Sequence, residues 1–153
     1  MSDLPIRFVV SDGGRKASGR RGFVGDCVVR SICIVSGRPY EEVYMSITRR
    51  GRVGKKPYRK HYSARQGVIS REAWFREYMD SIGFEWHKVQ RGVPISSPVF
   101  ACGRFVLDIR RHYTAMLDGV LHDTYDCSLD GRRKVCGYWS LRKNDLAPQG
   151  VIE

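Results

Sequence analysis

The segment from His112 to Tyr125, HYTAMLDGVLHDTY, decides the fold of the second half of the chain. At its centre Asp118 and Gly119 separate two apolar runs, and Asp-Gly in that position is typical of a two-residue β-hairpin turn. The turn also sets the pairing of the two strands, because Leu117 then lies opposite Val120 and the pairs continue outward from there. The segment therefore predicts an antiparallel hairpin with a defined register.

This register places one histidine beside one carboxylate. Thr114 then faces Asp123, and His112 faces Tyr125. Because side chains alternate between the two faces of a strand, His112 and Asp123 are diagonal neighbours on one face, within reach of a hydrogen bond. Asp126 is a rival carboxylate, but by the same alternation it points to the opposite face. The pattern thus selects His112 and Asp123 from the 4 histidines and 16 acidic residues of the chain.

Apolar periodicity predicts helices in the first half of the chain and strands in the second. Helices are expected at residues 26–36, at 39–50 ended by Gly51, and at 70–82 with Trp74, Tyr78 and Ile82 as its buried stripe. Strands are expected at residues 6–10, 84–89, within 100–109, at 112–117, 120–125 and 135–141. This order predicts one α+β domain over residues 1–153, with N-terminal helices packed on a C-terminal antiparallel sheet.

The first of these helices supplies a candidate nucleophile. In DCVVRSICIVS, residues 26–36, the β-branched residues leave a strand open, but Asp26 is a good N-cap and Gly37 a good terminator, which favours a buried helix. Cys27 is then the first helical residue, at the positive end of the helix dipole. A helix N-terminus and a nearby imidazolium both favour the thiolate, and the backbone N–H of Cys27 is an unpaired donor for an oxyanion.

The net charge of +11 is concentrated in one segment. Eight of the 27 Lys and Arg residues lie between residues 49 and 65, a stretch without an acidic residue. We expect a basic, mobile loop at about residues 49–66, which is either a solvated segment or a site that holds nucleic acid or an acidic protein. The candidate anion-binding residues are Arg49, Arg50, Arg52, Lys55, Lys56, Arg59 and Lys60.

The remaining composition excludes several classes of protein. Five cysteines, an odd number, predict reduced thiols in a cytoplasmic protein. No apolar run is long enough to span a membrane, and no membrane partner is expected. Cys33, Cys102, Cys127 and Cys136 are interpreted as core or strand positions. Without a C-x-x-C motif, we expect neither a metal nor another cofactor.

The chain order of these residues resembles the papain-like cysteine peptidase fold: a Cys at the start of a buried helix, then a His on one strand and an Asp on the next. The acidic residue directly before the Cys, in GDCVVRSICIVSG, is similar to the bacteriocin-processing double-glycine peptidases. Most of the chain, through GDCVVR, SARQGVISREAW and RHYTAMLDGVLHDTYDCS, also resembles small uncharacterised proteins of bacterial and bacteriophage genomes.

The resemblance implies a cysteine hydrolase acting on a peptide or isopeptide bond, with Cys27 as nucleophile, His112 as general base then acid, and Asp123 as orienting carboxylate. The same residues also suit transfer of the acyl group to another amine. One position departs from the family pattern: a Gln is expected about six residues before the Cys, and Arg21 stands there as a candidate oxyanion donor. The substrate is expected to be a peptide or protein, and an acidic one would suit the basic segment. A papain-fold binding protein without strong catalysis is the alternative.

Overall fold

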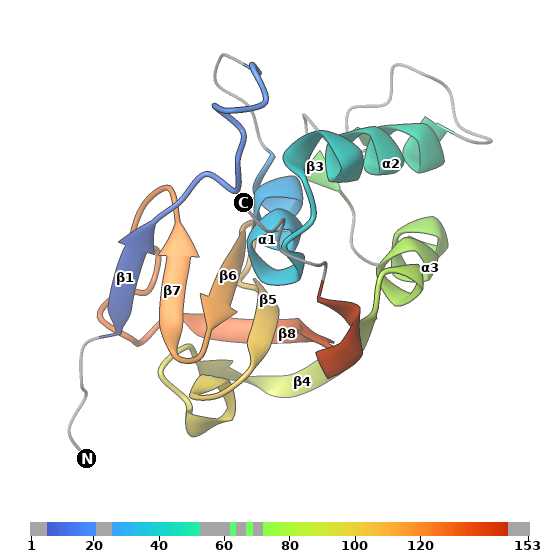
Figure 1. Ribbon diagram of the computed structural model, residues 1–153. Coiled ribbons are helices and arrows are strands. Elements are labelled where there is room, and N and C mark those ends of the chain that lie inside the picture. The colour runs from blue at the N-terminus through green and yellow to red at the C-terminus, as the bar shows by residue number, and fades with distance from the viewer. Residues whose placement is uncertain (1–5, 21–25, 53–61, 64–66, 69–71, 147–153) are drawn as a thin grey trace.

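The computed structural model describes residues 6–20, 26–52, 62–63, 67–68 and 72–146. Three helices cover one face of a six-stranded sheet (Figure 1). The α+β class and the order of the main elements agree with the sequence prediction. Among the described residues, no helix combines the length and the apolar character needed to cross a bilayer.

The main sheet is mixed and not purely antiparallel as predicted. Its strands are β1 (Arg7–Val10), β4 (Phe84–Pro94), β5 (Arg104–Asp108), β6 (Tyr113–Leu117), β7 (Val120–Asp123) and β8 (Lys134–Leu141), in the spatial order β1-β7-β6-β5-β8-β4. Strand β1 pairs with β7 in parallel, whereas the other pairings are antiparallel. The difference arises because the N-terminal segment adds to the free edge of the predicted hairpin. A separate two-stranded sheet joins β2 (Tyr62–Ser63) and β3 (Gly67–Val68).

The predicted hairpin register is confirmed. Ala115 pairs with His122, Met116 with Leu121, and Leu117 with Val120. Its two faces belong to different cores. Tyr113 and Ala115 pack with the helices, whereas Met116 and Leu121 pack in a second cluster on the other face, with Phe100, Phe105 and Ile109.

Helix α1 (Cys27–Ser36) is the buried centre of the helical layer. Val29, Ile32 and Val35 have no exposed surface, because residues on every side of this helix face either the sheet or another helix. Gly37 ends the helix in the left-handed conformation, and its N–H donates to the carbonyl of Cys33, as predicted. The β-branched residues that left a strand open are accommodated because tertiary burial outweighs their weak helix propensity.

The other two helices differ from the predictions mainly at their ends. Helix α2 spans Tyr40–Arg52, so Gly51 does not end it. Residues 49–52 are therefore helical and not part of a loop, and residues 53–61 and 64–66 of the predicted basic loop lie outside the described residues. Helix α3 spans Ala73–Ser81. The 3₁₀ turns η1 (Pro98–Phe100) and η2 (Lys143–Asp145) complete the described elements.

The buried stripe of α3 also needs correction. Phe75 and Met79 are fully buried beside Tyr78 and Ile82, whereas Trp74 is only half-buried. Phe75 is the residue that packs on the sheet, where its ring meets that of Trp139 edge-on. The predicted start at Ser70 lies outside the described residues.

Candidate active site

The candidate site lies at the end of the sheet where β7 ends and β6 begins. Asp123 is the last residue of β7, and His112 directly precedes β6. The backbone N–H of Ser11, just after β1, donates to the carbonyl of Asp123 at 2.8 Å. From there the chain reaches Arg15, whose side chain lies 3.6 Å from the carboxylate of Asp26. The start of α1 is thus connected to the same end of the sheet.

His112 and Asp123 form the predicted pair. The imidazole Nε2 of His112 lies 2.7 Å from Oδ2 of Asp123, and both side chains are largely buried, with 12% and 4% of their surface exposed. The other carboxylate oxygen, Oδ1, accepts a hydrogen bond from the backbone N–H of Thr124 at 2.7 Å. These contacts fix both the carboxylate and the orientation of the ring.

The electrostatics favour a protonated imidazole. Burial alone lowers the pKa of His112, but hydrogen bonding with Asp123, Cys127 and Cys27 outweighs burial and raises the pKa to about 12. Burial would raise the pKa of Asp123, yet the hydrogen bond and charge of His112 lower it below its ordinary value. The resting pair is therefore an imidazolium and a carboxylate.

Cys27 belongs to this group. It is the first residue of α1, is half-buried, and is among the hydrogen-bonding partners that raise the pKa of His112. Since Nε2 of His112 is occupied by Asp123, Nδ1 is the ring nitrogen left for proton exchange with a thiol. The structure thus places Cys27, His112 and Asp123, the three residues predicted from the sequence, at one site.

Asp26 does not act as predicted. It occupies the N-cap position of α1, but its side chain makes no capping hydrogen bond. Its carboxylate is fully buried instead, accepts a hydrogen bond from the hydroxyl of Tyr40 at 2.5 Å, and lies 3.5 Å from the guanidinium of Arg30. With Arg15 also nearby, Asp26 ties the start of α1 to α2 and to the segment after β1. This cluster positions the residue next to it, Cys27.

Cys127 is a member of the site that sequence reasoning missed. It was interpreted as a core position, and it is indeed buried, but its Sγ lies 3.6 Å from Oδ2 of Asp123. It follows β7 by four residues, in a loop whose path the hairpin pattern does not define. The exposed ring of Tyr125 was predicted opposite His112, and its centroid lies 5.3 Å from that of the imidazole.

The same atoms have the composition of a metal site. The donor atoms of His112, Asp123 and Cys127 all lie within 4.8 Å of one another. Nitrogen, sulfur and carboxylate oxygen are the ligands that zinc takes in proteins. The 2.7 Å separation of Nε2 and Oδ2 is a hydrogen-bond distance, so a metal would have to displace the proton that they share. Any test of the site therefore needs a chelator control.

The remaining candidates lie elsewhere or outside the description. Arg49 and Arg50 are exposed at the end of α2, and Arg52 is described only as part of that helix. Among the described side chains, neither Arg49 nor Arg50 forms a hydrogen bond or ion pair with His112. The other predicted residues, Arg21, Lys55, Lys56, Arg59 and Lys60, lie outside the described residues.

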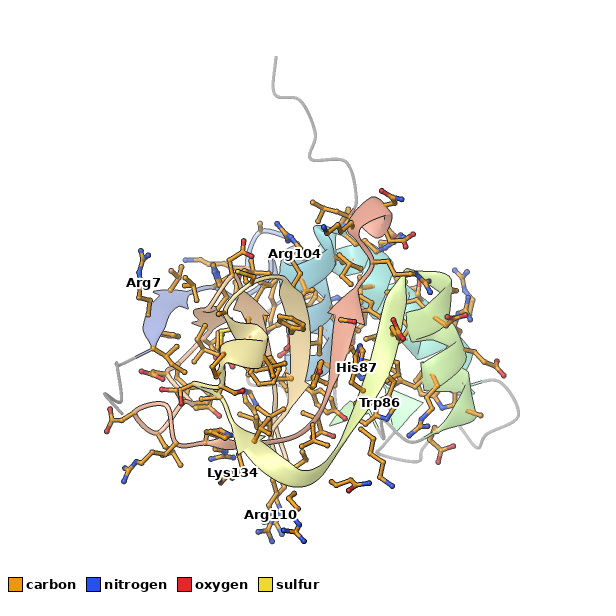
Figure 2. The ribbon with its side chains drawn as sticks, turned by 90° about the horizontal axis from the view of Figure 1, so that it is seen from below. Arg7, Trp86, His87, Arg104, Arg110 and Lys134 are labelled. Carbon is orange, nitrogen blue, oxygen red and sulfur yellow. The ribbon has the colours of Figure 1, made fainter. Side chains whose placement is uncertain are left out.

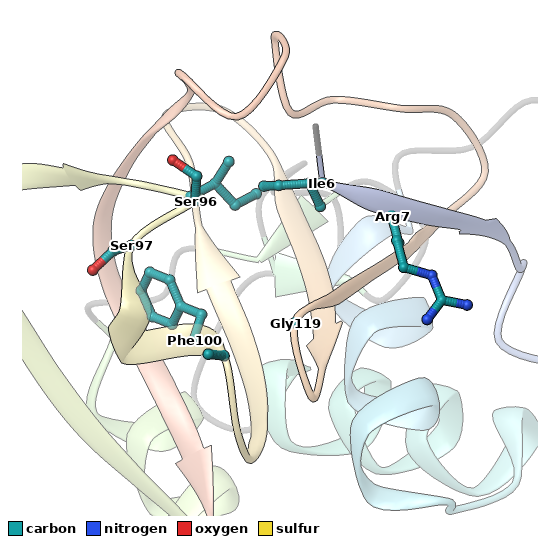
Figure 3. A pocket seen from close by; sticks show the side chains of 8 residues that line it. Ile6, Arg7, Ser96, Ser97, Phe100 and Gly119 are labelled. Atoms are coloured by element: carbon teal, nitrogen blue, oxygen red, sulfur yellow. The ribbon is translucent and has the colours of Figure 1, made fainter. Parts of the chain in front are cut away.

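A separate pocket lies at the opposite end of the β6–β7 hairpin. It has a volume of about 210 Å³ and is lined by Arg7, Ser96, Phe100 and Gly119 among others (Figure 3). Gly119 is in the hairpin turn, whereas His112 and Asp123 are at the far ends of its two strands. This pocket is therefore distinct from the candidate site.

Comparison of the chain with protein-family models, with curated proteins and with solved structures found no match.

Proposed function

We propose that the protein is a cysteine hydrolase that cleaves a peptide or isopeptide bond through an acyl-enzyme, on a papain-like architecture. The observation that carries the proposal is a half-buried thiol at the start of a buried helix, which contributes to the raised pKa of a histidine that a buried carboxylate holds. A thiolate beside an imidazolium is the reactive form of such a pair.

The first half-reaction needs a thiolate on Cys27 and a proton on His112. The Cys27 thiolate attacks the carbonyl carbon, and the carbonyl oxygen becomes an oxyanion that the backbone N–H of Cys27, in the first turn of α1, can stabilise. His112 then donates its proton to the leaving nitrogen, the C–N bond breaks, and a thioester remains on Cys27. Asp123 holds the ring so that Nδ1 faces the reacting atoms and stabilises its positive charge.

The second half-reaction regenerates the enzyme. Neutral His112 accepts a proton from water, the resulting hydroxide attacks the thioester carbon, and the C–S bond breaks to release an acid and the thiolate. If an amine takes the place of water, the acyl group is transferred, so the same residues serve either outcome.

Covalent capture tests the proposal. A peptidyl vinyl sulfone, applied with EDTA present, is expected to modify Cys27 alone among the 5 cysteines, as located by peptide mass spectrometry. The Cys27→Ala variant is expected to remain unmodified. Iodoacetamide at pH 6 is expected to react rapidly with Cys27 in the wild type and slowly in His112→Ala. Equal, slow reaction in both proteins would contradict the hydrolase.

A further inference from the structure

Strands β5 and β6 are joined by a tight turn made of two arginines. The N–H of Ile109 donates to the carbonyl of His112 at 2.9 Å, so the loop between them is only Arg110 and Arg111. Both have positive φ, +23° and +67°. A two-residue hairpin requires this conformation, but Gly and Asn adopt it far more readily than Arg. Arg110 and Arg111, which directly precede His112, therefore adopt a backbone conformation that is unfavourable for arginine.

Arg110 and Arg111 are exposed, and neither forms an ion pair with an acidic residue that the structure describes. Other arginines are paired, as Arg20 is with Glu41 and Arg38 with Glu42. The turn is thus a site of unneutralised positive charge.

A third arginine, Arg133, forms hydrogen bonds with the backbone of the turn. The guanidinium of Arg133 donates to the carbonyl oxygens of Ile109 at 3.4 Å and Arg110 at 3.3 Å. Figure 2 shows Arg110 and Lys134 gathered at this end of the sheet, with Arg104 at the other end. The turn is therefore held by a cation, which adds to its positive field and does not cancel it.

We propose that Arg110 and Arg111 select substrates that carry carboxylates close to the scissile bond, which rests on the hydrolase function proposed above. A chain placed for attack by Cys27 lies against His112, the residue that directly follows the turn. Carboxylates match guanidinium groups in charge and in bidentate geometry. An acidic peptide fits better than a nucleic acid, because a thiolate forms a thioester only with a carbonyl compound.

Two matched vinyl-sulfone probes test this selection. One carries Glu on both sides of the reactive group and the other carries Gln at the same places. At low salt and with EDTA, wild-type Cys27 is expected to react roughly three- to tenfold faster with the Glu probe, the effect of two exposed ion pairs. The preference should fall as salt is added. The double variant Arg110→Gln/Arg111→Gln should lose the preference while reacting with the Gln probe at the wild-type rate.

The control removes the same charge elsewhere. Arg49→Gln/Arg50→Gln, at the end of α2, is expected to keep the preference, and loss of the preference there would overturn the assignment to the turn. Equal reaction of wild type with both probes would overturn the selection but leave the hydrolase intact. No reaction with either probe would overturn both. Absence of a preference, together with binding of a short oligonucleotide that the Arg110/Arg111 double variant loses, would assign the turn to nucleic acid.

Discussion

The two tight turns that flank strand β6 have the same length and opposite character. Asp118 and Gly119, with φ of +46° and +80°, form the turn at one end, and Arg110 and Arg111 form the turn at the other. Asp118 also accepts a hydrogen bond from the N–H of Gly103 at 2.8 Å, which anchors its turn to the start of β5. The Asp-Gly turn has residues that readily adopt positive φ, whereas the Arg-Arg turn does not.

The difference follows the position of the candidate site. His112 and Asp123 lie at the arginine end of β6, whereas the other end lies beside two pockets, one lined by Gly119 and one by Asp118. Unfavourable backbone conformations persist where the surrounding structure enforces them, and they are concentrated at functional sites. The comparison suggests that the Asp-Gly turn serves folding and the Arg-Arg turn serves recognition, and the predictions below test that division.

The largest expected effect is the loss of Asp123 from the arginine end. In Asp123→Asn the second-order rate constant for capture of Cys27 by a vinyl sulfone should fall by about 10²–10⁴-fold, because the amide no longer stabilises the imidazolium; the corresponding change in serine-protease triads costs about 10⁴. The matched variant at the other turn, Asp118→Asn, should react at the wild-type rate. Equal rates in the two variants would remove the functional distinction between the two ends.

The second prediction concerns stability against pH. The pKa of His112 is about 12 in the folded protein, against an ordinary 6.5, so the folded state keeps a proton that the unfolded state loses above pH 6.5. In Cys27→Ala, where no thiol can give up a proton to the imidazole, the free energy of unfolding should therefore fall as pH rises from 6.5, by up to about 1.4 kcal/mol per unit. Urea unfolding of Cys27→Ala and Cys27→Ala/His112→Gln between pH 6.5 and 9 measures this, and the double variant should lack this contribution to the slope.

The acid side of the same profile depends on Asp123. Its pKa is lowered in the folded protein, so its contribution is present above the ordinary carboxyl value of about 3.9 and is lost as pH falls through the lowered pKa. The pair thus stabilises the fold most between about pH 4 and 6.5. A slope of Cys27→Ala above pH 6.5 that matches that of Cys27→Ala/His112→Gln would show that the imidazolium is not held as described.

The third prediction tests the folding role of the Asp-Gly turn. Gly119→Ala should lower the free energy of unfolding by about 1–2 kcal/mol, because an L-residue is strained at φ +80°. The added Cβ would also lie 3.4 Å from the carbonyl oxygen of Ala101. Urea unfolding checks the stability, and the rate of vinyl-sulfone capture should stay at the wild-type value. A variant that folds as stably as wild type would contradict the role assigned to this turn.

The two turns also show how much of this molecule the sequence predicts. Asp118–Gly119 carries a strong local signal, and from it the register, the His112–Asp123 pair and the two faces of the hairpin follow correctly. Arg110–Arg111 carries no such signal, since its conformation is imposed by the strands on either side. Local chemistry therefore predicts a turn only where the residues suit it.

Contacts made across the fold were the other features that could not be predicted. The parallel pairing of β1 with β7 depends on tertiary packing, and so does the approach of Cys127 to Asp123. Asp26 was predicted as a helix cap from its position, but the hydroxyl of Tyr40 and two arginines draw its carboxylate into a buried cluster. From sequence alone, a side chain such as Asp26 can be paired only with backbone groups close to it in the chain, and its distant partners are missed.

The smallest expected effect has the opposite sign. Arg111→Gly should raise the free energy of unfolding by about 0.5–1 kcal/mol, because relief of the left-handed strain at φ +67° exceeds the entropy that glycine loses on folding. Arg111→Gln is the matched control, since it removes the charge but keeps the Cβ, and its stability should equal that of wild type. Urea unfolding measures both. If the glutamine variant gained as much as the glycine variant, repulsion between the arginines and not backbone strain would be the cost that this turn carries. If only the glycine variant gains stability, and it also loses the preference for acidic probes, then Arg111 lowers the stability of the fold while it contributes to substrate recognition. The Asp-Gly turn at the other end of β6 has residues that suit its backbone, so stability and function do not conflict there.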